Sequence, residues 1–488
     1  MSIKLIPWVR GALGILVLGC CSSACVGPQR DWPDDLIWSP DGKHAAVLRL
    51  GFRVSDADGN LSAQLDDRVY RVAWLDSERV VLARTRTVGT FADVAAAVGR
   101  ERTRAIVAQA EHAWTHSRFA TPDASDFPDV RIEVPEKVLL LYLREHYGDV
   151  LREQSGEDWG QVEHTTADLH QLIVARVVGD RLELGTKLSE DVLPIKAIRP
   201  APDRRSVAFV TRNEETWFDD TARIHLVPID VLAQPRLVAE NTGDFLDWSL
   251  DSRALLYFSE SGSDPNIGRF GCLERRAVID ASGQIGQTNE SLARCLSYVI
   301  FDRSSRAFSL PDGRVVFESM NVELPRELGG PNRLFTLTRE PDKRHTSFDR
   351  FPVLPFISTD VLDRDQSIAF FDVSPDRMRV LFGTRTGDIR LLTLEDGRTE
   401  LLPLGLHRAE GYVTRDLPQA VWSGPDAFTY LKRVGTRNEF ILRRGSTETV
   451  LSRNWPKEML WPYPEDPSTT KTVPGRSPSA RRASSALR

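Results

Sequence analysis

The chain has 488 residues, which is too long for one ordinary domain unless that domain is built from repeats. Hydrophobic residues make up 41% and charged residues 27% of the sequence, which are values of globular proteins. The formal net charge of -6 argues against a nucleic-acid partner, because a nucleic-acid binder needs a basic face.

Residues 1–19 are predicted to be a signal peptide, with Lys4 and Arg10 in a positive leader and an apolar run, 11–19, that is too short to span a bilayer. Residues 17–20, Val-Leu-Gly-Cys, resemble the bacterial lipobox. The resemblance implies that Cys20 carries a diacylglycerol and acyl chains such as palmitate, so that the protein stays attached to a membrane. Because Cys21 follows rather than Asp, enterobacterial sorting rules imply the outer membrane, facing the periplasm. The alternative is a plain secretory signal.

After a linker, 20–34, the stretch WSPDGKHAAV at 38–47 predicts a β-hairpin. Proline fixes φ at the first corner, aspartate accepts hydrogen bonds from nearby amides, and glycine tolerates positive φ. The turn returns in altered form, each time before a β-rich run, at 75–78, 201–204, 249–252, 310–313, 374–377 and 423–426. The strand before the turn often ends in tryptophan, as at Trp38, Trp74, Trp248 and Trp422.

These seven units predict an all-β fold, a seven-bladed β-propeller over 35–460, with six or eight blades as alternatives. A four-stranded blade needs about 40 to 45 residues, and six of the seven units fit that length. The repeat resembles that of the TolB-type β-propellers of the bacterial periplasm, in which W-x-P-D-G followed by alternating apolar residues marks each blade. The resemblance implies a peptide-binding channel, although no residue-level motif of that site carries over.

Asp56, Asp58 and Asn60 in the first unit superficially suggest a calcium loop. The equivalent turn at 395–397 of the sixth unit is a plain hairpin turn, so we interpret the first as a turn too.

The second unit contains the largest insertion, 88–163, in which two segments have apolar residues at helical spacing. We expect a helical insertion that is either a lid or docking arm, or a packed decoration. His112 and His116 lie four residues apart on the first of these helices. They are interpreted as solvated residues or, in the alternative, as two metal ligands.

Short turns are expected on one face of the propeller and long connections on the other, the loop face, where binding residues are expected. The candidate ligand-binding residues on long loops or near strand ends are Trp217, Asp219, Arg269, Arg385 and Arg437. Trp217 and Asp219 combine an aromatic platform with a carboxylate, and the arginines are able to bind a carboxylate in bidentate fashion. No catalytic residues, metal ligands or cofactor are assigned.

Cys272 and Cys295 are the only cysteines of the predicted folded body, and an oxidising compartment favours a disulfide between them. Two buried thiols are the alternative. Residues 464–488 are rich in Ser, Pro and Arg and are predicted to be a disordered basic tail.

The sequence therefore predicts a membrane-anchored, extracytoplasmic, non-enzymatic propeller that binds a protein, peptide or envelope glycan through its loop face. One alternative is a metal-dependent hydrolase or lactonase-like enzyme with its site at the channel mouth. Another is a structural component of the envelope.

Overall fold

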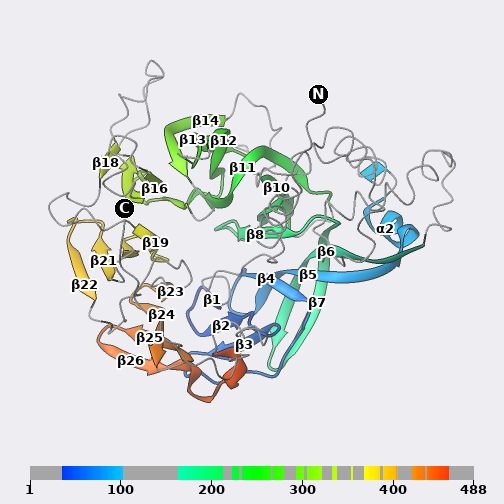
Figure 1. Cartoon of the computed structure of the whole chain (residues 1–488), viewed down its shortest axis with the longest axis horizontal. Coiled ribbons are helices and arrows are strands. Elements are labelled where there is room, and N and C mark those ends of the chain that lie inside the picture. The colour runs from blue at the N-terminus through cyan, green and yellow to red at the C-terminus, as the bar shows by residue number, and fades with distance from the viewer. Residues whose placement is uncertain are drawn as a thin grey trace, which may run out of the picture.

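The computed structural model describes residues 36–99, 101–102, 163–212, 222–229, 233–264, 268–279, 293–301, 305–320, 332–337, 353–355, 368–384, 388–402, 404, 420–434 and 437–460. Within these residues the fold is nearly all β, with antiparallel sheets that follow one another around a centre in chain order, as in a β-propeller (Figure 1).

We number the repeat units 1 to 7 by their hairpins. Unit 1 contains β1 (Leu36–Trp38), β2 (His44–Val47) and β3 (Arg53–Asp56). Unit 2 contains β4 (Val69–Trp74), β5 (Arg79–Thr90), β6 (Glu163–Val178) and β7 (Arg181–Asp191). Unit 3 begins with β8 (Ile195–Pro200), β9 (Ser206–Arg212) and β10 (Ala222–Pro228). Unit 4 ends with β12 (Ala254–Asp264), β13 (Gly268–Ala277) and β14 (Ala293–Phe301).

Units 3 and 4 form one seven-stranded sheet because they share the long strand β11 (Arg236–Trp248). Its first half pairs with β10 and its second half pairs with β12. Unit 5 contains β15 (Ala307–Ser309), β16 (Val315–Met320), β17 (Asn332–Leu337) and β18 (Val353–Pro355). Unit 6 contains β19 (Ile368–Val373), β20 (Arg379–Thr384), β21 (Ile389–Thr393) and β22 (Thr399–Leu402).

Unit 7 contains β23 (Ala420–Gly424), β24 (Ala427–Val434), β25 (Arg437–Arg444) and β26 (Thr447–Val450), followed by the 3-10 turns η8 (Leu451–Asn454) and η9 (Lys457–Met459). All seven predicted hairpins are present, each joining the first two strands of its unit in antiparallel register.

Local hydrogen bonds stabilise the hairpin turns. In unit 1 the Ser39 hydroxyl donates to Asp41 (2.7 Å), and Asp41 accepts from the Lys43 amide (3.2 Å). Units 4 and 6 repeat this arrangement at Ser249 with Asp251 and at Ser374 with Asp376. The residue after the turn aspartate has positive φ in five units, at Gly42, Arg204, Ser252, Gly313 and Arg377.

The core consists of apolar layers between neighbouring sheets rather than one central cluster. Each layer draws side chains from adjacent units, and one of them joins Leu36 and Trp38 of unit 1 to Phe440 of unit 7 and to Trp455, which follows η8. Because the sheets are covered on both faces, their strands carry continuous apolar runs, as the sequence indicated.

Tryptophans at the ends of first strands connect neighbouring units. The indole nitrogens of Trp74, Trp248 and Trp422 donate to backbone carbonyls of the preceding unit's first strand, at Ile37, Arg199 and Asp372 (2.9 to 3.1 Å). Trp38 of unit 1 donates to the Thr429 hydroxyl of unit 7 (2.9 Å), and β1 contacts both β4 and β23. Units 1 and 7 are therefore neighbours, although no described strand of one pairs with a strand of the other.

The first sheet has three strands rather than the expected four. Residues 61–66 run beside β3 but form only isolated bridges, Ser55 with Leu61 and Phe52 with Asp66. The Ser62 hydroxyl accepts the amide hydrogen bond of Val54 (3.0 Å), so that a side chain replaces a backbone carbonyl in the ladder.

β5 continues to Thr90 and β6 begins at Glu163, so the segment predicted as the insertion of unit 2 lies between these two strands. It opens with α2 (Phe91–Val98), which contacts β5, β6 and β7. Residues 103–162, with His112 and His116, lie outside the described residues, as do the predicted signal peptide, the linker and the tail. No helix among the described residues is long and apolar enough to cross a membrane.

Candidate functional site

Most of the predicted binding residues fall outside what the structure describes. Trp217, Asp219 and Arg385 are not among the described residues. Arg437 is the first residue of β25, the third strand of unit 7, and it pairs in register with Val434.

Arg269 is the one predicted binding residue whose side chain is described. It lies on β13, the third strand of unit 4, between Ser263 and Phe301 on the neighbouring strands. Its Nε lies 3.6 Å from the Glu260 carboxylate, which is nearly buried. The described residues therefore do not bring Arg269 together with the other candidates.

On the loop face, the second and third strands extend beyond the first strand of their unit, and among the described residues they do so farthest in units 2 and 4. In unit 2 the first residue of β4, Val69, lies opposite Arg84, whereas the β5–β6 pairing continues as far as Thr90 with Glu163. In unit 4 the β12–β13 pairing continues to Asp264 with Gly268. Figure 1 shows β5 and β6 running out from the ring toward α2.

The root of the unit 2 insertion is held by paired charges at the end of β7. Arg102 forms a bidentate ion pair with Asp191 (2.8 and 3.0 Å). The neighbouring Glu190, whose side chain is almost fully buried, accepts hydrogen bonds from Arg86, Gln171 and Lys187 (2.6 to 2.8 Å). Burial by itself raises the pKa of the Glu190 carboxyl, but these three donors outweigh it and lower that pKa.

Two histidines lie near Asp191, of which His170 is buried and His225 is half-buried. His170 Nδ1 is 3.0 Å from the Tyr70 hydroxyl, which also accepts from the Ile195 amide, and His225 Nε2 is 3.1 Å from the Thr211 hydroxyl. Since the Tyr70 oxygen already accepts, its own proton is available to His170. Burial lowers the pKa of each histidine to about 4, against the opposing charge of Asp191.

A charge cluster, which the sequence did not predict, lies at the turn ends of first strands. It consists of Arg199, Asp247, Arg306, Asp372 and Arg377, from units 3 to 6. Arg377 forms a bidentate pair with Asp247 (3.0 Å for both bonds), and Arg306 lies 3.9 Å from Asp372. Burial raises the pKa of the Asp372 carboxyl, although the charges of Arg306 and Arg199 oppose that rise.

The repeat itself contains the signal for this charge cluster. Arg199, Asp247 and Asp372 each stand two residues before the turn of their unit, a position that is apolar in the other four units. An alignment of the seven repeat sequences therefore shows these three charged residues as exceptions at an otherwise apolar position.

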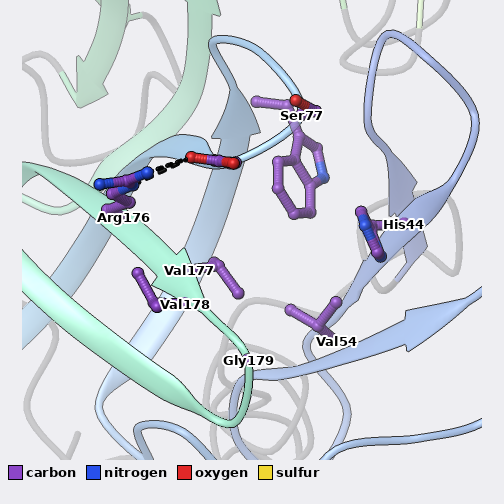
Figure 2. A pocket seen from close by; sticks show the side chains of 9 residues that line it. His44, Val54, Ser77, Arg176, Val177, Val178 and Gly179 are labelled. Carbon is purple, nitrogen blue, oxygen red and sulfur yellow. Dashed lines mark hydrogen bonds and ion pairs between the residues drawn. The ribbon is translucent and has the colours of Figure 1, made fainter.

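A groove of about 280 Å³ lies between units 1 and 2, on the face of the hairpin turns (Figure 2). Unit 1 contributes His44 and Val54. Unit 2 contributes Trp74, Ser77 and Glu78 around its first turn, and 176–179 at the end of β6. Figure 2 shows His44 and Val54 across the open space from Val177 and Val178.

The groove has an apolar floor and a polar rim. Val54 and Trp74 are buried, and the Trp74 N–H is already donated to Ile37, so the indole offers only carbon surface. On the rim, Arg176 donates two hydrogen bonds to one oxygen of Glu78 (2.5 and 3.0 Å), and both side chains are about half exposed.

No group of three or more His, Cys, Asp or Glu side chains suited to a metal occurs in the described part of the chain. The suspected calcium loop forms a turn, as interpreted from the sequence: Asp56 accepts from the amides of Asp58 (2.9 Å) and Asn60 (2.8 Å) and from the Asn60 side chain (2.7 Å).

The predicted disulfide is present in the structure. It joins Cys272 on β13 to Cys295 on β14, with a Cα–Cα distance of 5.4 Å. The β13–β14 register shifts between Leu273 and Glu274, which sets the two cysteines diagonally across the strands.

No family model matches the sequence, and neither does any curated protein. Among solved structures, the chain is similar to TolB from Acinetobacter baumannii, with 14% identity, 57% of each chain covered and a TM-score of 0.33. It is also similar to a puromycin hydrolase, with 12% identity over 58% of this chain and 43% of that one and a TM-score of 0.38.

A third similar structure is the β-propeller domain of the Trilobed protease from Pyrococcus furiosus, with 14% identity, 58% of this chain and 90% of that domain covered, and a TM-score of 0.28. This chain covers little more than half of the TolB chain and less than half of the puromycin hydrolase. Likenesses of this degree carry no argument about function, so the assignment of an all-β, propeller-like architecture rests on the sheets themselves.

Proposed function

We propose that this chain is a seven-bladed β-propeller of the bacterial cell envelope that binds a protein, peptide or envelope glycan through its loop face, without catalysing a reaction. The observation that supports the binding face is the asymmetry between the two ends of the strands. The hairpin turns are short and hold themselves by hydrogen bonds, whereas β5–β6 and β12–β13 extend past their sheets on the loop face.

Such extensions are suited to recognition because they are anchored at their base. Arg102, Arg86 and Lys187 pair with the acidic end of β7 below the unit 2 extension, and the disulfide joins β13 to β14 near the unit 4 extension. A rigid base lets the residues beyond it contact a partner at low cost in conformational entropy. Trp217 and Asp219, from the connection between β9 and β10, and Arg385, from the connection between β20 and β21, are proposed to contribute to this face.

Site-specific photo-crosslinking in membranes tests the binding face. A photoreactive residue replaces Thr87 on the unit 2 extension, and the matched control replaces Asp396 in an exposed hairpin turn of unit 6. We expect a discrete adduct from position 87 and none from position 396. No adduct at position 87, or equal adducts at both, would contradict the proposal.

We also propose that Cys20 carries the lipid anchor, on the strength of residues 17–20 alone. The Cys20→Ala variant is expected to move from the membrane fraction to the soluble periplasmic fraction. Retention of this variant in the membrane fraction would refute the anchor and leave the binding proposal standing.

A further inference from the structure

We propose that the groove between units 1 and 2 is a binding site for an uncharged aromatic ring that carries a hydroxyl, that is, a phenol-type group. The site lies on the hairpin face and is independent of the partner proposed for the loop face.

The size of the groove limits the ligand to one ring. Ligand pockets for drug-sized molecules begin at about 300 Å³. At about 280 Å³ the groove has room for a single ring with a short substituent. Its floor of Val54, Trp74 and Val177 offers carbon surface on which a flat ring buries its faces.

The charges around the groove cancel, which favours a neutral ligand. Glu78 is paired with Arg176 on the rim, and Asp41 lies 3.8 Å from Lys43 in the adjoining turn. A carboxylate or an ammonium group entering the groove would lose hydration and meet an already paired charge of the opposite sign.

Two polar groups remain for a hydroxyl. Within the described part of the chain, neither the His44 imidazole nor the Ser77 hydroxyl has a hydrogen-bond partner, and the two border the groove from unit 1 and unit 2. A phenolic hydroxyl both donates and accepts, so it matches the imidazole as well as the serine hydroxyl at the edge of the groove. A sugar needs more hydrogen-bond partners than these two groups, and a plain hydrocarbon forms a hydrogen bond with neither of them.

Saturation-transfer NMR on the folded protein tests the site with 4-ethylphenol and with N-acetyltyrosinamide. We expect saturable binding in the millimolar range for a phenol, and at least tenfold weaker binding of 4-hydroxybenzoate and tyramine. Stronger binding of N-acetyltyrosinamide than of 4-ethylphenol identifies a tyrosine side chain of a peptide as the source, and the reverse order identifies a small phenol.

Three variants locate the binding. Val178→Asp places a charge on the rim at a side chain that is 43% exposed, so the fold is expected to tolerate it, and phenol binding falls at least tenfold. His44→Ala and Ser77→Ala each weaken binding about three- to tenfold, because each removes one hydrogen bond.

Leu184→Asp is the matched control, since Leu184 is 47% exposed on β7 and does not border the groove. It is expected to bind as the wild type does, with every variant checked for an unchanged melting temperature. Absence of saturable binding, equal binding of the charged phenols, or wild-type binding by Val178→Asp would overturn the proposal.

Discussion

Two single residues, His170 and His225, are expected to lower the free energy of unfolding at acidic pH. His170 is buried and His225 half-buried between units 2 and 3, each with one hydroxyl partner, and removal from water lowers the pKa of each to about 4 from an ordinary value of 6.5. In the unfolded chain both imidazoles take up protons near pH 6.5. Between these two values the unfolded state therefore binds more protons than the native state.

The free energy of unfolding is expected to be constant above about pH 6.5 and to fall as the pH drops toward 4. Each histidine contributes a loss on the order of 3 kcal/mol at the lower end, and no further loss below it. Urea unfolding at pH 7, 5.5 and 4 measures this decline. Replacing both residues by glutamine is expected to flatten it, and an equally steep decline in that variant would show that other groups cause it.

At the scale of the element, the conformation of a hairpin depends on residues within the turn. The conformation of a long connection depends on contacts with distant parts of the chain. The serine and aspartate of a turn bond to each other and to amides a few residues away, so the turn forms wherever the motif occurs. Even Arg204 and Arg377 adopt the positive φ that glycine adopts in units 1 and 5. The root of the insertion depends instead on Arg102 reaching Asp191 on β7, a contact between segments far apart in the sequence.

Arg102→Ala is expected to release the root of the insertion, because it removes both bonds of the bidentate pair with Asp191. Limited proteolysis of the native protein should then cut between residues 103 and 162 several-fold faster than in the wild type. Arg398→Ala, which removes an exposed ion pair with Asp396 in unit 6, is the control and should leave the rate unchanged. Equal rates in the two variants would show that Asp191 does not hold the insertion.

At the scale of the whole molecule, the first and last units meet by packing, since none of the strands that the structure describes is shared between them. Trp455 packs on Phe440 and donates to the Gly59 carbonyl (3.0 Å), and Trp38 donates to Thr429. Gly59 lies so close to the Leu451 carbonyl that an added Cβ would stand 2.2 Å from its oxygen. This junction holds units 1 and 7 together.

Gly59→Ala is expected to weaken the junction, whereas Gly397→Ala is not. Both glycines occupy corresponding turns with positive φ, but nothing lies within 4 Å of a Cβ at Gly397. Gly397→Ala should cost about 1 kcal/mol of backbone strain, and Gly59→Ala about 2 kcal/mol more, because the Leu451 backbone must move. Urea unfolding curves compare them, and equal losses would mean that the junction contributes no stability.

The sequence by itself determined the repeat, because each hairpin depends on residues within one turn and each strand on its own apolar run. It therefore predicted all seven hairpins, the turn at Asp56 and the Cys272–Cys295 bond. It did not predict the sheet shared by units 3 and 4, the charge cluster around Asp247 and Asp372, or the groove beside His44. From the sequence, His44 is assigned only to the first hairpin. Only the tertiary structure decided these, because each depends on side chains from different units that meet when the sheets pack around the centre.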